Sequence, residues 1–263
     1  MTFDQLLLEW NLGQDGISVP PGWTQGRATF GGLVAAMLHE KMAIEVAQDS
    51  SLRSVTFSFV APVGAEAVQT SAEILRAGRS VTQMQGHLRQ NDAVVLAGLA
   101  SYGRGRDSSV EVNEAAAAEF DEPNKCVALP YFEGIVPEFT QKFDYRIAIG
   151  QLPFSGTKER QLGGWVRFKD GSENTVGISH LLALIDAWPP ATLPMLKTPA
   201  PASSLTWTLE FMEPLPNHKA SDWWQYLAEV EQAEDGYAVI QARLWDKDGR
   251  LVALSRQMVT IFG

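Results

Sequence analysis

The sequence lacks what several classes of protein require. Cys126 is the only cysteine among 263 residues, so neither an internal disulfide nor a cysteine-rich metal site is available. The four histidines, His39, His87, His180 and His218, show no HExxH or HxH spacing, which argues against a zinc site. No GxSxG, Walker-type or GxGxxG motif is present. We therefore expect neither a metal nor a cofactor.

Long apolar runs are also missing, because none approaches the ~20 residues of a membrane span. The N-terminal segment MTFDQLLLEW has no basic region, so it does not have the pattern of a secretory signal. The net charge of −10 argues against a nucleic-acid partner, which normally needs a clustered basic surface. We expect a soluble cytoplasmic protein with no nucleic-acid or membrane partner.

Positive charge is nevertheless concentrated in the first half of the chain. The arginines there are Arg76, Arg79, Arg89, Arg104 and Arg106. They are either ordinary solvated surface residues or a local patch that opposes the net charge, so a phosphate-bearing ligand remains compatible with the composition.

What the chain does contain is one pattern that occurs twice in the same order. Each copy has a glycine-led apolar helix pattern, an alternating strand that ends in Phe-x-x-Pro, and a hairpin with an aspartate in its turn. The paired segments are 31–44 and 177–191, then 54–62 and 206–214, then 87–97 and 243–253. This order predicts a duplicated α+β unit. The two helices differ where the first offers His39 and the second offers Asp186, and we expect the chemistry at this difference.

A long helix packed on an antiparallel sheet, occurring twice, is the double hotdog plan. We predict central helices at 31–44 and 177–188, each wrapped by an antiparallel sheet, with Pro189 ending the second helix. The predicted division is an N-terminal unit 1–107, a linker 108–139 and a C-terminal unit 140–263. The linker is alanine-rich, acidic and interrupted by prolines, with one helical turn expected near Asn113–Phe120. Alternation predicts strands at 53–61, 66–77, 80–89, 94–104, 203–213, 223–233, 236–246 and 250–262. The second unit starts near Lys142 with the segments FDYRIAIG and GGWVRFKDG (163–171), which precede its helix.

The chain resembles the acyl-CoA thioesterase II family and its thioesterase-like relatives, which are double hotdog hydrolases. The resemblance runs through most of both halves and depends on the order and spacing of several short segments. These are Trp23 with Phe30-Gly31-Gly32, Trp165-Val166-Arg167, Asp186, Phe211 with Pro214, and Leu251-Val252-Ala253 with Gln257.

This resemblance implies that Asp186, Ser204 and Gln257 hold the water that hydrolyses an acyl-CoA thioester. Ser204 stands where the family pattern has threonine, so the hydroxyl is kept and the methyl group is lost. Thr206 lies two residues further on, which predicts that it shares the strand face of Ser204 and is an alternative hydroxyl. The C-terminal unit therefore carries the expected catalytic set.

The residue chemistry agrees with this implication. A lone carboxylate inside the apolar run LLALIDAW is costly unless it meets hydrogen-bond donors, which Ser204 and Gln257 can supply. Asp186 would act as a general base or orient the water. Backbone N–H groups at a helix start would hold the oxyanion, either at Gly31 and Gly32 or at Ser179 with its neighbour Ile178.

Three functions remain open at this point. The first is a thioesterase that hydrolyses acyl-CoA by direct attack of water. The second is a hotdog hydratase or dehydratase that pairs His39 with Asp186, although no helix here has the local Asp-x-x-x-x-His spacing. The third is a catalytically silent acyl-CoA-binding protein. Because hotdog sheets leave edges that pair between subunits, we expect a homo-oligomer, as a dimer or higher.

Overall fold

The computed structural model describes residues 1–13, 18–113, 116–170 and 174–262. The first half contains a central helix followed by four long strands, and a short helix and a small two-stranded hairpin come before the central helix. These elements are α1 (Phe3–Leu12), β1 (Thr24–Gln25), β2 (Ala28–Thr29), α2 (Gly31–Ile44), β3 (Ser51–Phe59), β4 (Gln69–Ala77), β5 (Val81–Gln90) and β6 (Ala93–Gly103).

The second half repeats this order with a shorter helix and two extra strands before it. Its elements are β8 (Phe143–Ile149), β9 (Gln161–Phe168), α3 (Ile178–Asp186), β10 (Ala202–Phe211), β11 (Trp224–Glu234), β12 (Tyr237–Trp245) and β13 (Leu251–Ile261). Short elements complete the chain, namely η1 (Pro123–Lys125), β7 (Val127–Ala128), η2 (Glu138–Lys142) and η3 (Leu193–Met195).

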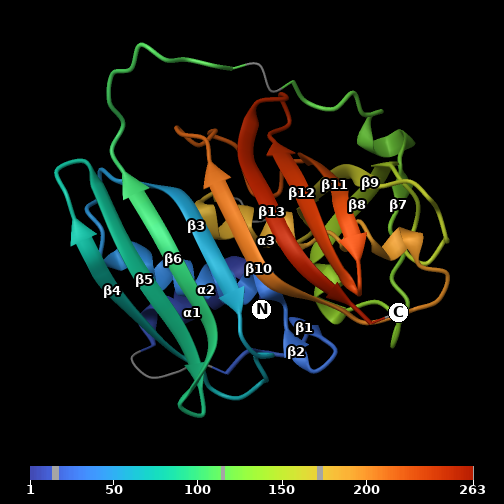
Figure 1. The fold of residues 1–263 in the computed structure, drawn as a ribbon, viewed down its shortest axis with the longest axis horizontal. Coiled ribbons are helices and arrows are strands. Elements are labelled where there is room, and N and C mark those ends of the chain that lie inside the picture. Colours follow the sequence, from blue (N-terminus) through green and yellow to red (C-terminus); the bar gives the residue numbers. More distant parts are fainter. Residues whose placement is uncertain (14–17, 114–115, 171–173, 263) are drawn as a thin grey trace.

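The long strands form one continuous sheet in which every pairing is antiparallel. Its order is β4-β5-β6-β3-β10-β13-β12-β11-β9-β8-β7. The strands that wrap the two helices belong to this one sheet, because β3 and β10 pair edge to edge at the centre (Figure 1). Each strand thereby satisfies the exposed hydrogen-bonding edge of the other, which is the physical reason that the two sheets merge.

The two halves are related by an approximate twofold axis that passes through the β3–β10 pair. Thr56 and Thr208 each lie three residues before the phenylalanine of their Phe-x-x-Pro segment. They pair directly across the two strands, and their hydroxyl oxygens lie 3.0 Å apart. A residue that faces its own counterpart lies on the symmetry axis, so this pair supports the duplication predicted from the sequence.

Helices α2 and α3 lie behind the sheet and are packed against each other (Figure 1). Nearly all of α2 from Gly32 to His39 is buried, as is α3 from Ser179 to Ile185. Gly32 allows this close packing, because a Cβ atom there would lie 2.9 Å from Cα of Ala183. A helix enclosed by a curved sheet and a second helix needs apolar residues on all sides, which is what both sequences provide.

The predicted elements agree with the structure in type and order, but several bounds differ. For example, β4 begins at Gln69 rather than at residue 66, and β9 spans Gln161–Phe168 where the sequence indicated the segment 163–171. The first helix has the predicted bounds, whereas α3 ends at Asp186, two residues before the expected end, with Ala187 as its C-cap. The helical turn expected near Asn113–Phe120 falls partly on 114–115, outside the described residues, and the remainder of that segment is not helical.

None of the helices within the described residues is both long and apolar enough to cross a bilayer.

Candidate active site

Asp186 is the last residue of α3 and is half-buried beside the first turn of α2. The backbone N–H of Gly32 donates a hydrogen bond to its carboxylate. The Gln257 side chain on β13 donates another, with 3.1 Å between Nε2 and Oδ1. The structure therefore joins two of the residues that the sequence singled out, Asp186 and Gln257, although 71 positions separate them.

Gly31 makes room for this carboxylate. A Cβ atom at Gly31 would lie 2.7 Å from Oδ2 of Asp186, so any side chain there would displace the carboxylate. Among the described residues, none accepts a hydrogen bond from the Gly31 N–H group. The two glycines, which were both expected to hold the oxyanion, thus differ. Gly32 binds the carboxylate, and the Gly31 N–H remains free for a ligand.

Burial raises the pKa of Asp186 from 3.8 to about 7, and the hydrogen bonds from Gln257 and Gly32 oppose this rise. A carboxyl group with a pKa near 7 exchanges a proton readily at neutral pH, which suits a general base. Burial, reinforced by the charge of Asp186, also raises the pKa of Tyr145 and Tyr226 well above the ordinary range. Both tyrosines therefore stay protonated next to the site.

These tyrosines belong to an aromatic wall behind Asp186 that the sequence analysis missed. The Tyr145 hydroxyl donates to the carbonyl of Ala187 at 3.1 Å, directly after the helix end. Trp188 stacks on Tyr226 with ring centroids 5.2 Å apart and meets Tyr145 edge to face. The sequence predicted the strand that carries Tyr226 and placed Tyr145 in the segment FDYRIAIG, but such patterns give no information that the two side chains meet at the end of α3.

Ser204 lies on the inner face of β10 and Thr206 on the outer face. Ser204 pairs with Val259, which is fully buried, whereas Thr206 is exposed and pairs with Met258. A β-bulge at Leu205 breaks the alternation between them. The expectation that Thr206 shares the face of Ser204 was therefore wrong, because one extra residue in a strand reverses the following side chains.

Ser204 is a diagonal neighbour of Gln257, since Gln257 pairs with Trp207 and Val259 pairs with Ser204. Diagonal neighbours on one sheet face lie about 7–8 Å apart. Within the described residues no hydrogen bond joins Ser204 to Asp186. The structure thus places Ser204 on the sheet face that carries Gln257, without a direct hydrogen bond to Asp186.

Ser179 lies at the opposite end of α3 from Asp186. Its hydroxyl donates to Glu40 of α2 at 2.5 Å, and Glu40 also accepts a hydrogen bond from Asn11 of α1. Seven residues of helix separate Ser179 from Asp186, which corresponds to about 10 Å. This position does not support the oxyanion role that we expected for Ser179.

His39 is also far from Asp186. It is buried near the C-terminal end of α2, where its Nδ1 lies 3.3 Å from the Tyr102 hydroxyl. Burial lowers its pKa to about 4, opposed by Glu40, so the imidazole is neutral at pH 7. Because Asp186 meets Gly31 at the other end of α2, about 12 Å of helix separates the two residues. An Asp/His pair in one site, as the hydratase alternative requires, is not formed.

Cys126 is no candidate nucleophile. Burial, reinforced by Asp121, raises the pKa of its thiol, and Sγ is directed at the carbonyls of Asp121 and Glu122 at 3.4 and 3.5 Å. A reactive cysteine needs a lowered pKa and a positively charged surrounding.

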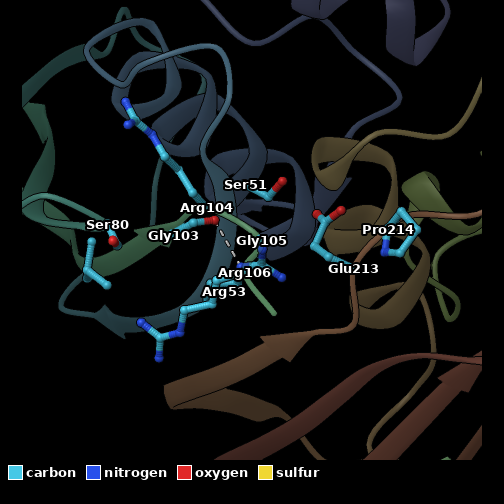
Figure 2. A pocket seen from close by; sticks show the side chains of 10 residues that line it. Ser51, Arg53, Ser80, Gly103, Arg104, Gly105, Arg106, Glu213 and Pro214 are labelled. Atoms are coloured by element: carbon cyan, nitrogen blue, oxygen red, sulfur yellow. Dashed lines mark hydrogen bonds between the residues drawn. The ribbon is translucent and has the colours of Figure 1, made fainter. Parts of the chain in front are cut away.

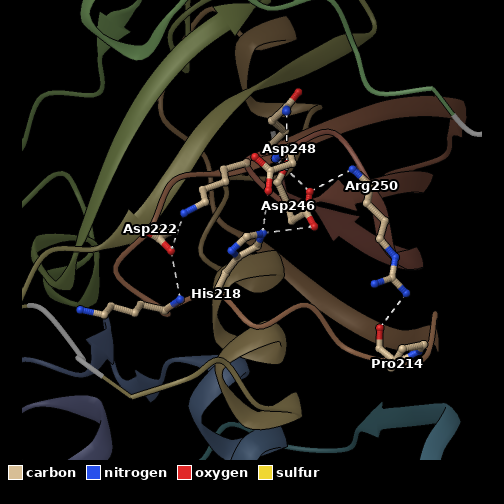
Figure 3. A network of polar contacts seen from close by, with 9 residues as sticks. Pro214, His218, Asp222, Asp246, Asp248 and Arg250 are labelled. Atoms are coloured by element: carbon tan, nitrogen blue, oxygen red, sulfur yellow. Dashed lines mark hydrogen bonds and ion pairs between the residues drawn. The ribbon is translucent and has the colours of Figure 1, made fainter.

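One group among the described residues has the ligand types for a metal ion, namely His218, Asp246 and Asp248. Nε2 of His218 contacts both carboxylates, at 3.5 Å from Asp246 and 3.1 Å from Asp248 (Figure 3). Asp246 also accepts the backbone N–H groups of Asp248 and Arg250, which folds the turn between β12 and β13. This turn accounts for the arrangement, and no spacing motif could reveal it because His218 comes from a separate loop.

Family models match both halves of the chain. The acyl-CoA thioesterase N-terminal domain matches residues 19–103, and the acyl-CoA thioesterase C-terminal domain matches residues 123–261. A comparison with curated proteins finds no match.

Solved structures share the fold at low sequence identity. A conserved protein of unknown function with a hot dog fold from Alicyclobacillus acidocaldarius has a TM-score of 0.82 at 21% identity, covering 94% of this chain and 92% of that one. An acyl-CoA thioesterase II from Mycobacterium marinum has a TM-score of 0.72 at 20% identity, covering 88% of each chain. The tesB protein of Mycobacterium avium subspecies paratuberculosis has a TM-score of 0.76 at 16% identity, covering 100% of each chain. The fold is thus the predicted double hotdog, and the chain belongs to the acyl-CoA thioesterase family and is a thioester hydrolase.

Proposed function

We propose that the chain hydrolyses the thioester bond of acyl-CoA by direct attack of water, with Asp186 as the general base. The observation that carries this proposal is the carboxylate of Asp186, held by Gln257 and Gly32 with a pKa raised to about 7. Ser204 lies on the same inner sheet face, where its hydroxyl can contact the water. Gln257 and Ser204 position the carboxylate and the water.

The reaction proceeds in two steps. The water oxygen bonds to the thioester carbonyl carbon while one of its protons passes to Asp186, and the carbonyl electrons move to oxygen. The C=O bond then re-forms, the C–S bond breaks, and the leaving sulfur takes the proton from Asp186. The products are a carboxylic acid and CoA, and the enzyme returns to its starting state.

The negative charge that develops on the carbonyl oxygen needs a donor. The Gly31 N–H group has no acceptor among the described residues and belongs to the first turn of α2, where the helix dipole favours negative charge. The Gly32 N–H is bound to Asp186, so it orients the base. One glycine therefore serves the oxyanion and the other serves the carboxylate.

The decisive experiment measures free thiol released from a short-chain and a long-chain acyl-CoA, with intact-mass analysis of the quenched enzyme. We expect thiol release, no acyl adduct, and a kcat/KM that rises as the pH passes through about 7, because only ionised Asp186 accepts a proton. An acyl group trapped on Ser204 or Cys126 would show that the reaction passes through a covalent acyl-enzyme and would contradict direct attack by water. Hydration of an enoyl-CoA without thiol release would identify a hydratase, and binding without either reaction would identify a silent binder.

Two organisational features accompany this proposal. We propose that the units divide at residues 1–107 and 140–263, joined by 108–139, and that the chain assembles as a homo-oligomer through its free sheet edges, β4 and β7. Light scattering coupled to size-exclusion chromatography tests the assembly, and a monomeric mass would contradict it.

A further inference from the structure

Five arginines gather at one end of the first unit, in a chain whose net charge is −10. They come from β3, from the end of β4 and the turn after it, and from the segment that follows β6. The residues are Arg53, Arg76, Arg79, Arg104 and Arg106. Two adjoining cavities of about 620 and 340 Å³ lie between them and share Ser80 and Val81 in their walls. Figure 2 shows the larger cavity, with Glu213 and Pro214 on its far side. We call this region the arginine groove.

Most of the positive charge in the arginine groove is not neutralised. Arg104 pairs with Asp49 at 2.9 Å, and Arg53 donates to the backbone carbonyl of Gly103 at 3.0 Å. The other three, Arg76, Arg79 and Arg106, make no hydrogen bond or ion pair with any described residue.

A single carboxylate, Glu213, lines the larger cavity, and it already accepts the Leu215 N–H at 3.1 Å. Counting Asp49 as well, the region has five guanidinium groups and two carboxylates. The surplus favours a ligand with at least two negative charges.

The groove occupies a defined place in the duplicated fold. The axis through Thr56 and Thr208 relates Ser51 and Arg53 of the groove to Ser203 and Leu205, which flank Ser204. The arginine groove is thus the counterpart, in the first unit, of the sheet end next to Asp186. It lies beyond the C-terminal end of α2, about 20 Å of helix from Gly31.

We infer that the arginine groove binds a small ligand that carries two or more phosphate groups. Guanidinium groups stay charged at all physiological pH values and match phosphate oxygens with paired N–H donors. The larger cavity is open to solvent, and its volume of about 620 Å³ lies in the range of small-ligand sites. The ligand is either the nucleotide end of a CoA molecule or a free nucleotide, since both present the same phosphate chemistry. This site is separate from Asp186 and does not depend on the proposed hydrolytic mechanism.

Calorimetric titration of the full chain tests this inference with pyrophosphate, 3′,5′-ADP, ADP and uncharged adenosine as probes. We expect saturable binding of the three phosphorylated probes and none of adenosine, with affinity falling as salt rises from ~50 to ~200 mM. The double variant Arg79→Gln/Arg106→Gln should weaken binding at least ~10-fold. Both side chains are exposed and unpaired, so the fold should be unaffected, which the melting temperature checks.

Two controls make the result specific. Arg243→Gln removes one positive charge from an exposed position on β12 that pairs with no described residue, and it should leave the dissociation constant within about twofold. Asp186→Asn should also leave it unchanged, because the groove is remote from the hydrolytic site. Tighter binding of 3′,5′-ADP than of ADP would identify the CoA nucleotide, and equal binding would identify a general nucleotide site. Absence of binding by the unmodified chain, or an equal loss in the Arg243→Gln variant, would overturn the inference.

Discussion

The pair of buried helices α2 and α3 has a carboxylate at each of its two ends, and the side chains around the two carboxylates differ. At one end Asp186 meets the first turn of α2 and binds Gly32 and Gln257. At the other end Glu40 meets the first turn of α3 and binds Ser179 and Asn11. Both ends thus place a carboxylate at the start of the partner helix, where the helix dipole favours it. A carboxylate in this position is therefore not sufficient for a catalytic site.

The strands around the two carboxylates make the difference. Trp207 pairs with Gln257, and its counterpart Val55 pairs with Ala100, so Gln257 corresponds to Ala100. By the same relation Ser204 corresponds to Leu52. Ala100 and Leu52 are both buried and apolar. The Glu40 end therefore has no counterpart of the Gln257 amide or of the Ser204 hydroxyl.

Helix α1 adds to this difference by covering the Glu40 end. Besides the bond from Asn11 to Glu40, Asp4 lies 2.6 Å from the ring of His180, and Trp10 donates to the Met37 carbonyl at 3.1 Å. Its start is fixed by Thr2, which forms a capping box with Gln5. The polar groups of this end are satisfied within the protein, whereas those of the Asp186 end retain capacity for water and substrate.

The largest expected effect comes from replacing each carboxylate in turn. Asp186→Asn should lower kcat by about 10²–10⁴-fold with little change in KM, because the amide is isosteric but cannot accept a proton. Glu40→Gln should leave kcat within about twofold and lower the free energy of unfolding by about 1–2 kcal/mol through weaker bonds to Ser179 and Asn11. Steady-state kinetics and chemical denaturation measure both variants. Equal loss of turnover in the two variants would show that both ends take part.

The same Asp186→Asn variant should be more stable than the unmodified chain at alkaline pH. The pKa of Asp186 is about 7 in the folded chain and near 3.8 when unfolded, so the folded state binds the proton more tightly. Stability is therefore lost as the pH rises from about 4 to 7, and asparagine removes this cost. Each kcal/mol corresponds to a rise of about 2–4 °C in melting temperature for a chain of this size. The gain at pH 8 should shrink toward pH 5, and a gain independent of pH would contradict the assigned cause.

Replacing either glycine at the Asp186 end by alanine should have a different effect, on activity for Gly31 and on stability for Gly32. In Gly31→Ala the added Cβ would displace the carboxylate of Asp186, and misplacement by ~1 Å costs about 10²-fold in rate. In Gly32→Ala the Cβ would meet the Phe30 ring and the backbone of Ala183, so the helix pair must separate at a cost of about 1–3 kcal/mol. We expect Gly31→Ala to keep its melting temperature and lose activity, and Gly32→Ala to melt lower. A fully active Gly31→Ala enzyme would remove Gly31 from the site.

Much of the fold follows from local patterns, which explains why it was predictable. The apolar run after Gly31 and the Phe-x-x-Pro strand ends define elements without reference to the rest of the chain. The predicted helix 31–44 matches α2 at both ends, and the predicted β13 differs by one residue at each end. Asp186 was identifiable for the same reason, because a carboxylate is conspicuous in an apolar helix.

The remaining features depend on contacts between distant segments. The bulge at Leu205, which separates Ser204 from Thr206, has an equivalent at Arg53, although the two residue types have nothing in common. The aligned helices suggested His39 as the counterpart of Asp186, whereas the contact with the partner helix is made by Glu40, one residue further on. A sequence pattern does not fix an alignment to within one residue, yet a shift of one residue decides which side chain enters a site.

Gln257→Ala should shift the pH dependence as well as the rate. The hydrogen bond from Gln257 lowers the pKa of Asp186, so its loss should raise the midpoint of kcat/KM above about 7. A hydrogen bond to a charged group contributes about 1.5–3 kcal/mol, which corresponds to a shift on the order of one pH unit. The pH profile of kcat/KM measures this shift, with Ala100→Gly at the other end as the control. A rate loss with an unchanged midpoint would mean that Gln257 contacts substrate rather than the base.

The smallest expected effect separates the two hydroxyl residues of β10. Ser204 faces inward beside Gln257, so Ser204→Ala removes one hydrogen bond to the water and should lower kcat by roughly 3- to 10-fold, since a neutral hydrogen bond contributes about 1 kcal/mol. Thr206 faces outward beyond the bulge at Leu205, so Thr206→Ala should leave kcat unchanged. Steady-state kinetics of the two variants under identical conditions decide between them. If Thr206→Ala were the slower enzyme, Ser204 would not be the hydroxyl residue of the site. The difference between Ser204 and its counterpart Leu52 would then not explain why the two ends differ.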